Sequence, residues 1–424
     1  MKKIVFICLF VIFATLYAGT AYAQGFRHIP WSFNVYNDYG EHVATFSSQY
    51  VYVLNEYDDG WILINTGYGN LWVNIDDVPA LYGRTIILDP GHGAGADNVF
   101  MGYSEGNAMF ALAEHLKPLL QAQGANVLLT RPDLYNVHLT LRAAYMNLWS
   151  LEAFAKCPYA MEAAYSIIMQ SRRDIKELIY NRAFYVYCDG YCNYYFYDGY
   201  YYVYYEGYGY YRIYYIGYFR PDDFEYCLPT LNKPWDYDPP AIYCIFAELD
   251  RLKNAMRRII YDFSTYAHVY FNFPFDSSRQ RLIHPDLHHI FALQAHPSIS
   301  SNFFAISLHS NATGRPINTR IHGADVYIMQ NDNPNSQSYF ASYTATEKTY
   351  AFADILLDKI DELGISRRAI KPGNFFIIRE TNLPMALVEN GFHTNPHDRS
   401  LLSNDAFLYR LAHAYVDALS QIFK

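Results

Sequence analysis

The chain has 424 residues, which is long enough for two or three domains, and its formal net charge at pH 7 is −9. An acidic chain is poorly suited to nucleic acid or to an anionic lipid surface, so we expect neither as a partner. These numbers place no limit on an uncharged or zwitterionic ligand.

The N-terminal residues have the layout of a secretory signal peptide. Lys2 and Lys3 precede an apolar run over 4–14, and the small residues Ala21 and Ala23 follow it. This order predicts cleavage after Ala23, which removes 1–23. The apolar run is too short for a comfortable membrane span, and no later stretch is long and apolar enough. We therefore expect an exported mature protein without a membrane span.

Five cysteines follow the cleavage site: Cys157, Cys188, Cys192, Cys227 and Cys244. Export permits disulfides, and an odd number leaves at least one thiol over. Cys188 and Cys192 have the spacing of half a metal site. Because no second closely spaced pair exists, disulfides or inert thiols are favoured.

Short runs of alternating apolar and polar residues predict a small antiparallel β-barrel over 31–80, with turn signals at 58–60 and 67–70. The pairs Gly60-Trp61 and Trp72-Val73, with this turn spacing, resemble the bacterial Src-homology-3-like domain. The alternative is an N-terminal hairpin that packs on the next domain.

From residue 84 the pattern changes to alternating strands and helices, which is typical of an α/β domain. We expect strands at 85–88, 126–130, 303–308, 323–329, 375–378 and 385–388, and helices at 105–121, 139–149, 336–363 and 401–423. The stretches 84–149 and 302–424 complete each other. The predicted fold is therefore an open, mostly parallel sheet flanked by helices and interrupted by an α+β insertion over 150–301.

The insertion has an unusual composition. Its stretches 152–180 and 244–262 have helical character, and about half of 184–219 is tyrosine. Asp-Gly and Glu-Gly pairs divide the tyrosine runs and predict hairpins. A small twisted sheet with its phenol hydroxyls in water is favoured over a sugar-stacking surface, the alternative that aromatic faces allow.

Four histidines lie near the end of the insertion: His284, His288, His289 and His296. His284 and His288 have the i,i+4 spacing of metal ligands on a helix. We expect a flexible or surface position for them, with a metal-binding or site-plugging role as the alternative.

Three residues of metal-ligand type stand at the ends of predicted elements. His92 follows the first strand of the α/β domain, Glu105 opens a helix, and His309 ends the strand after the insertion. Each alone has an ordinary structural explanation, as a loop cap, a first-turn carboxylate or a strand-end histidine. Carboxyl ends of parallel strands meet at one edge, however, and two imidazoles with one carboxylate suit zinc with an open position.

Glu389 ends another predicted strand at the same edge. A carboxylate that does not bind the metal can take a proton from zinc-bound water and pass it to a leaving nitrogen. The spacing indicates a zinc hydrolase and leaves its reaction open.

Four motifs carry a family resemblance: Asp89-Pro90-Gly91-His92-Gly93, Glu105 at a helix start, Ser307-Leu308-His309-Ser310-Asn311, and Leu387-Val388-Glu389-Asn390-Gly391-Phe392. They resemble the zinc-dependent N-acetylmuramoyl-L-alanine amidase family. Supporting matches are Leu129-Thr130-Arg131, Leu141-Arg142, Gly323-Ala324-Asp325-Val326, Arg379-Glu380-Thr381, Pro384 and Asn395. The resemblance spans 84–149 and 302–423 in the family's order. It implies Zn²⁺ at His92, Glu105 and His309, with Glu389 as the catalytic carboxylate.

The resemblance implies hydrolysis of the amide bond between N-acetylmuramic acid and L-alanine in peptidoglycan, during wall remodelling or daughter-cell separation. It places the exported protein in the periplasm or at the cell wall. Two alternatives stay open: an exported zinc peptidase acting on stem peptides, and a non-catalytic wall-binding protein.

Two features depart from the family. Residues 150–301 occupy a place where members usually have a short link, and where some carry a regulatory helix over the site. We therefore expect an autoinhibitory or substrate-gripping role, with an activator protein acting on 150–301 as a candidate partner. Ser310 stands where alanine is more common, and we expect little effect from it.

Overall fold

The structure is a computed structural model. It describes residues 25–57, 59–67, 69–181, 187–188, 193–197, 200–205, 209–213, 224–226, 244–271, 285–314, 317–329 and 346–423. The predicted signal peptide over 1–23 lies outside the described residues.

One compact unit contains the first six strands: β1 (Gly25–Ile29), β2 (Phe33–Tyr36), β3 (His42–Phe46), β4 (Gln49–Glu56), β5 (Trp61–Thr66) and β6 (Gly69–Asn74). They form one sheet in the order β1-β4-β5-β6-β2-β3, and the neighbouring strands pair antiparallel. Alternate residues point inward and make a separate core: Ile29, Phe33, Val35, Val51, Val53, Ile62, Ile64, Leu71 and Val73. The antiparallel pairing agrees with the alternating runs, whereas the closed barrel and its Src-homology-3-like character stay predictions.

The second unit is built on a six-stranded sheet: β7 (Thr85–Pro90), β10 (Asn126–Leu129), β16 (Phe303–Asn311), β17 (Ala324–Ile328), β18 (Arg367–Pro372) and β19 (Met385–Phe392). The strand order is β10-β7-β16-β19-β17-β18. β7, β16 and β19 run parallel, whereas β17 pairs antiparallel with β19 and parallel with β18. The sheet is therefore mixed: its described pairings are parallel except at the β19–β17 junction, so the expected mostly parallel sheet contains one reversal of direction.

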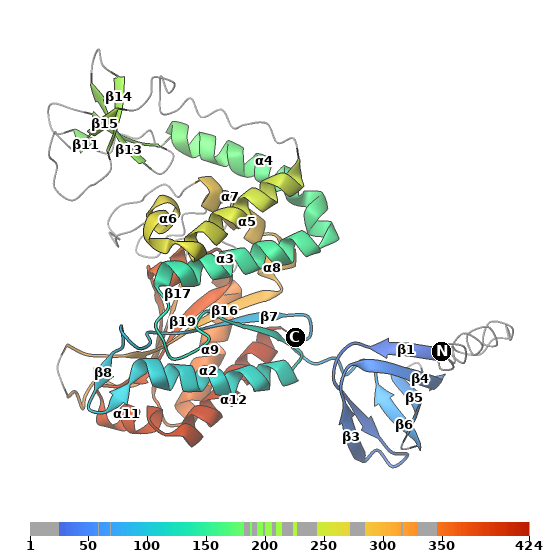
Figure 1. The fold of residues 1–424 in the computed structure, drawn as a ribbon. Coiled ribbons are helices and arrows are strands. Elements are labelled where there is room, and N and C mark those ends of the chain that lie inside the picture. Colours follow the sequence, from blue (N-terminus) through green and yellow to red (C-terminus); the bar gives the residue numbers. More distant parts are fainter. Residues whose placement is uncertain are drawn as a thin grey trace. The chain divides into compact units, whose positions relative to one another are not determined.

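Helices cover both faces of this sheet: α2 (Glu105–Ala122), α3 (Leu139–Lys156), α9 (Thr346–Glu362), α10 (Phe376–Arg379), α11 (Pro396–Leu402) and α12 (Asp405–Ile422). α2 and α12 lie on one face and α3 on the other (Figure 1). The central strands are buried on both sides, which explains their nearly continuous apolar sequences. A two-stranded ribbon, β8 (Val99–Phe100) with β9 (Tyr103–Ser104), precedes α2.

The strand predicted at 375–378 is wrong, because this segment forms α10 instead. Periodicity cannot separate a strand from a helix in so short an apolar run. Here tertiary contacts decide: all four residues of α10 are buried, and the Phe376 ring lies 5.7 Å from that of Phe271. The long helix predicted over 336–363 is described from Thr346, as α9.

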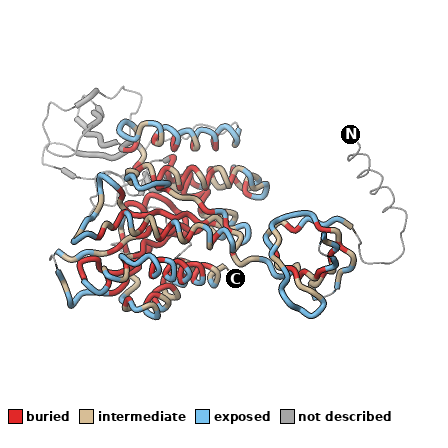
Figure 2. The backbone as a smooth tube through the Cα atoms, turned by 60° about the horizontal axis from the view of Figure 1, so that its bottom comes forward, coloured by how far each residue is buried: buried red, intermediate tan, exposed pale blue. Residues whose placement is uncertain are grey.

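The inserted segment contributes five helices: α4 (Pro158–Asn181), α5 (Ile245–Tyr261), α6 (Phe263–Tyr270), α7 (Pro285–Gln294) and α8 (Pro297–Ser300). α3 packs against α5 and α7, and α4 packs against α7. One apolar core joins sheet and insertion, since it includes Ala305 of β16, Phe154 of α3 and Leu252 of α5. In Figure 2 the buried residues, in red, continue from the sheet into the helices beyond it. The helical part of the insertion is thus an added layer of the same domain.

The tyrosine-rich segment contains a second, wholly antiparallel sheet: β11 (Tyr187–Cys188), β12 (Asn193–Tyr197), β13 (Tyr200–Tyr205), β14 (Gly209–Ile213) and β15 (Phe224–Tyr226). Tyr197 pairs with Tyr200, which leaves two residues between β12 and β13. That is the hairpin spacing that an Asp-Gly pair predicts. The side chains of this segment lie outside the described residues, so the sugar-stacking alternative stays a hypothesis.

The expected surface position of the inserted histidines is wrong for two of them. His288 and His289 of α7 are only 3% and 2% exposed. The Ser171 hydroxyl of α4 lies 2.8 Å from Nδ1 of each. Buried polar groups need such partners, so this cluster stabilises the α4–α7 contact. His296 caps α8 by accepting a hydrogen bond from the Ser298 backbone, and His284 lies outside the described residues.

Cys157 and Cys244 are free thiols. The side chains of Cys188, Cys192 and Cys227 lie outside the described residues, so the disulfide prediction stays open. Within the described part of the chain, none of the helices combines the length and apolarity needed to cross a membrane.

Candidate metal centre

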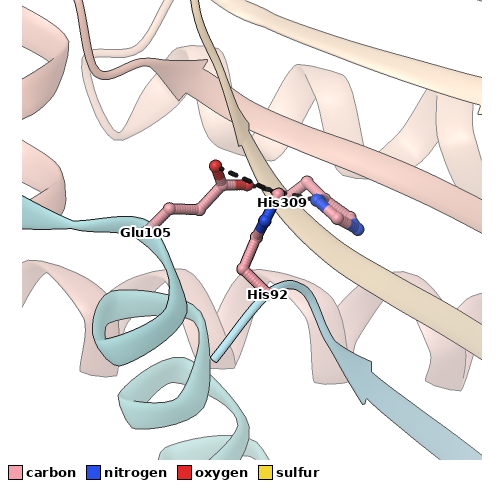
Figure 3. A group of neighbouring side chains, drawn as sticks. All are labelled: His92, Glu105 and His309. Carbon is pink, nitrogen blue, oxygen red and sulfur yellow. Dashed lines mark hydrogen bonds and ion pairs between the residues drawn. The ribbon is translucent and has the colours of Figure 1, made fainter. Parts of the chain in front are cut away.

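The three predicted ligands come together at the carboxyl edge of the sheet. His92 lies in the loop after β7, Glu105 is the first residue of α2, and His309 lies in β16 (Figure 3). His92 Nε2 is 3.4 Å from Glu105 Oε2, and His309 Nδ1 is 3.1 Å from Glu105 Oε1. One ligand atom from each residue lies within 4.8 Å of the others. The arrangement can hold a metal ion.

The glycines beside His92 allow this approach. His92 itself has a φ of +56°, in the left-handed region that non-glycine residues seldom adopt. A Cβ on Gly91 would stand 2.4 Å from His309 Cε1, and one on Gly93 would stand 2.7 Å from the Asn136 backbone. The loop can therefore pass His309 only without a side chain at Gly91, and the Asn136 backbone only without one at Gly93.

Two buried arginines hold the loop by its carbonyl groups. Arg142 donates to the His92 oxygen at 2.7 Å and to the Pro90 oxygen at 2.6 Å. Arg131 donates to the Gly91 oxygen at 3.3 Å. Burial and the neighbouring Arg142 lower the pKa of Arg131 to about 10. Only the resemblance pointed to these arginines, because their contacts with the loop are tertiary and leave no local sequence pattern.

The partners of His92 fix its orientation. Its Nδ1 lies 3.0 Å from the Ala96 carbonyl oxygen, which can only accept, so Nδ1 carries the proton. Nε2 then offers its lone pair toward Glu105. Asn98 Nδ2 donates to Glu105 Oε2 at 2.8 Å and thereby orients that carboxylate.

Glu105 is 1% exposed and ionised. Burial acts to raise its pKa, but the hydrogen bond and charge of His309, with the charge of His92, lower the pKa of Glu105 to about 2. The Ser310 amide also donates to Oε1 at 2.9 Å. A buried carboxylate between two imidazoles is suited to a cation.

A buried polar network surrounds Ser310, the residue whose amide donates to Glu105. The Tyr103 hydroxyl donates to Ser310 Oγ at 2.9 Å, and Ser310 Oγ lies 3.0 Å from His393 Nδ1. The Tyr103 and His393 rings stack with centroids 5.4 Å apart. The hydroxyl that distinguishes Ser310 from alanine therefore has two buried partners. No local sequence pattern points to Tyr103 or His393.

Glu389 lies beside the ligand cluster. The strand register places His309, Glu389 and Asp325 next to one another on β16, β19 and β17. Glu389 Oε2 is buried and has no hydrogen-bond partner among the described residues. Burial, with the negative charges of Glu105 and Asp325, raises the pKa of Glu389 to about 7 against the opposing effects of His309 and Lys371. Such a carboxyl can hold or release a proton near neutral pH.

The sequence profile of the N-acetylmuramoyl-L-alanine amidase family matches residues 86–157 and 295–421. These segments are the two halves of the α/β domain, and they include all three ligands and Glu389. The α/β domain belongs to the N-acetylmuramoyl-L-alanine amidase family. The profile does not cover 158–294, which contain α4 to α7 and the tyrosine-rich sheet.

Individual relatives agree with this assignment of the amidase domain. N-acetylmuramoyl-L-alanine amidase CwlM of Bacillus licheniformis is 30% identical over 105 residues, which are 24% of this chain and 42% of the relative. A sporulation-specific N-acetylmuramoyl-L-alanine amidase of Bacillus subtilis (strain 168) is 30% identical over 106 residues, 24% of this chain and 41% of the relative. The chain thus spans about two fifths of the length of these curated relatives.

A solved structure aligns with this chain at a TM-score of 0.35. It is the catalytic domain of the N-acetylmuramoyl-L-alanine amidase CwlV from Bacillus (Paenibacillus) polymyxa var. colistinus, with 14% identity over 80% of this chain and 97% of that chain. The assignment of the amidase domain rests on the profile and the curated relatives.

Proposed function

We propose that the protein hydrolyses the amide bond between N-acetylmuramic acid and L-alanine in peptidoglycan, with Zn²⁺ held by His92, Glu105 and His309 and with Glu389 as the catalytic carboxylate. The observation that carries this proposal is the placement of Glu389. The carboxyl oxygen Oε2 of Glu389 is buried and has no hydrogen-bond partner among the described residues, and Glu389 pairs in register with His309.

The donor set fits zinc. Two imidazole nitrogens and one carboxylate are a common catalytic set, and they leave a coordination position open for water. His92 would bind through Nε2, because its Nδ1 is engaged by the Ala96 carbonyl. When bound, the metal lowers the pKa of a coordinated water toward about 7 and polarises the substrate carbonyl.

The remaining steps belong to the protein. Glu389, as a carboxylate, accepts the proton of the attacking water and then, as a carboxylic acid, donates it to the leaving nitrogen of L-alanine. Both steps need a group that changes protonation state easily, and a pKa of about 7 provides it. Glu105 stays ionised throughout, which matches a ligand rather than a proton carrier.

The test is a peptidoglycan digestion with the products identified by mass spectrometry. The proposal predicts intact stem peptides with a free L-alanine amine, and no such release when a chelator is present. Stem peptides cut internally would instead support the zinc peptidase. Absence of any product would leave the wall-binding protein as the better explanation.

We propose that the protein is exported. The segment 1–23 and the small residues before Gln24 support secretion to the periplasm or the cell wall. Cell fractionation, with the mass of the mature N-terminus, tests it; a cytoplasmic protein that retains Met1 would contradict it.

The unit formed by β1 to β6 supports a second role, retention on the wall as a bacterial Src-homology-3-like domain. It carries a surface pocket lined by aromatic side chains, among them Phe26, Phe46, Tyr50 and Tyr52. Tyr50 is 71% exposed and available to a ligand. Tyr50→Ala should reduce cosedimentation with purified wall, whereas Tyr39→Ala, which removes an exposed tyrosine outside the pocket, should not.

The insertion is placed to influence the amidase domain. The Phe263 ring at the start of α6 stacks on His138 at the N-cap of α3, with centroids 4.8 Å apart. α3 also carries Arg142, which holds the His92 loop. These contacts connect the insertion to the His92 loop. They support an autoinhibitory or substrate-gripping role that an activator protein relieves or assists.

Deleting all of 150–300 would remove helices that complete the core. The sharper experiment replaces 182–243, between α4 and α5, with a flexible linker and leaves those helices in place. Higher amidase activity would support autoinhibition, and weaker wall binding would support gripping. If both stay unchanged, neither role belongs to this segment.

A further inference from the structure

Two cations of β18, the edge strand of the sheet, meet at Asp325 of β17, which pairs in register with Glu389 of β19. Asp325 is fully buried; its Oδ2 is 3.0 Å from Arg368 Nε, and its Oδ1 is 2.9 Å from Lys371 Nζ. One carboxylate thus meets two positive charges, and these three groups together carry a formal charge of +1. Neither cation was singled out by the sequence.

The two cations have different surroundings. Arg368 donates a second hydrogen bond to the His322 carbonyl oxygen at 3.1 Å and lies 5.1 Å from the centre of the Phe392 ring, so it is held by protein groups. Lys371 lies with its ammonium 5.5 Å from the centre of the Tyr327 ring, and its side chain is 34% exposed, against 35% for Arg368. Exposure therefore does not separate the two cations, but the Arg368 guanidinium has three protein partners and the Lys371 ammonium has two, so Lys371 retains more capacity to bind a ligand.

Two aromatic rings border this ammonium group. The rings of Tyr327 and Phe375 meet edge to face with centroids 4.9 Å apart, and Phe375 is 42% exposed. Tyr327 pairs with Lys371 across β17 and β18, so their side chains share one face of the sheet. An exposed ring beside a cation is suited to a ligand with an apolar stretch next to an anionic group.

The reaction direction places one part of the substrate here. In the proposed mechanism Glu389 donates the proton to the leaving nitrogen, so the peptide that leaves would lie on the Glu389 side of the broken bond. From Glu389 the register continues to Asp325 on β17 and then to β18, the strand of Lys371. The glycan, attached to the opposite side of the amide, would then extend away from these strands. In a stem peptide the residue after L-alanine is a glutamate linked through its side chain, so its α-carboxyl group is free or amidated.

We propose that Lys371, with Tyr327 and Phe375 beside it, forms a subsite that binds a carboxylate of the stem peptide and makes the enzyme prefer a free carboxylate over its amide. The inference rests on the proposed function and deepens it. Lys371 is a specificity-determining residue here, whereas Arg368 keeps Asp325 in place.

The experiment compares two synthetic muramoyl peptides that differ only in the second residue, D-isoglutamate or D-isoglutamine. Wild-type enzyme should favour the carboxylate in kcat/KM by about fivefold, the effect of a partly exposed ion pair. Lys371→Met should reduce the ratio to about one, mainly through a higher KM for the carboxylate substrate. Lys371→Arg should retain the preference, because it retains the charge.

The ratio within each variant does not depend on how much protein is folded, so a partial loss of stability leaves it interpretable. Lys371→Gln serves as a second neutral variant whose amide can still donate to Asp325. The matched control is Lys359→Met, which removes a lysine paired with Asp417 of α12. It should leave the ratio at the wild-type value.

Binding of the free peptides, L-alanyl-D-isoglutamate and L-alanyl-D-isoglutamine, is measured separately by calorimetry. Tighter binding of the carboxylate peptide to wild type than to Lys371→Met supports the subsite. Equal kcat/KM for both substrates in wild type, or an unchanged ratio in both neutral variants, overturns it while leaving the amidase function intact. If wild type hydrolyses neither substrate, the proposed function fails and the subsite fails with it.

Discussion

Burial of His288 in α7 predicts a fold that loses stability at acidic pH. Burial lowers the pKa of His288 to about 4, although the negative charge of Asp174 opposes the shift. An unfolded chain binds the same proton with a pKa of about 6.5. Because the pKa of His288 is lower in the folded state than in the unfolded state, protonation favours unfolding. The free energy of unfolding is therefore at its full value above pH 6.5 and decreases as the pH falls toward 4. The full pKa difference corresponds to about 3 kcal/mol of unfolding free energy, of which about 2 kcal/mol is lost between pH 7 and pH 5.

Urea unfolding followed by the helical circular dichroism signal measures this loss. Residues 25–84, as far as the structure describes them, contain no α-helix, so the helical signal of the described residues reports the α/β domain and its inserted layer. His288→Gln keeps a polar partner for Ser171 but does not titrate in this range. We expect the variant to lose about 2 kcal/mol less than wild type on going from pH 7 to pH 5. Equal losses in the two proteins would refute the assignment of this sensitivity to His288.

Three further predictions concern the metal centre. Glu389→Gln should lower kcat by about 10²- to 10⁴-fold while zinc content by elemental analysis stays at the wild-type level, and Glu362→Gln on the exposed end of α9 should change neither. An active Glu389→Gln enzyme would remove this residue from the mechanism. Arg142→Met should weaken zinc binding by about tenfold or more in a chelator competition, because the His92 loop loses its anchor, and unchanged affinity would contradict the role we assign to that arginine. Ser310→Ala should cost about 1 kcal/mol in unfolding free energy by leaving Tyr103 without its acceptor; a loss within error would restore the expectation of little effect.

The candidate site was largely predictable because its members sit at element ends. His92 follows β7, Glu105 begins α2, and His309 lies near the end of β16, and parallel strands bring such ends together. Their supports were not predictable in the same way. Arg142 reaches Pro90 across 52 positions of sequence, and no local pattern encodes that contact.

The fold was predictable where the periodicity was long and regular, as in α2 and α12, and failed where a short apolar run had two solutions. Phe376 and Ile377 form a buried helical turn because α10 packs against α3 and β19, with the Phe376 ring against Phe271 at the end of α6. The reversal at β17 has a similar origin, since the direction of a strand depends on connections that its own residues do not specify. His288 looked polar and exposed in sequence, and only its neighbour Ser171 on α4 explains its burial.

The connectivity of the sheet also determines when the candidate site is assembled during synthesis of the chain. β7 needs β16 as its neighbour, and Glu105 and His309 stand 204 positions apart in the sequence. Contacts between such distant segments form late, because a long loop must close first. A chain still being synthesised therefore holds His92 and Glu105 without His309 or Glu389. By this order of assembly, the proposed amidase site is complete only after almost the whole polypeptide has been made, and if the protein is exported as we propose, hydrolysis would begin only as export is completed.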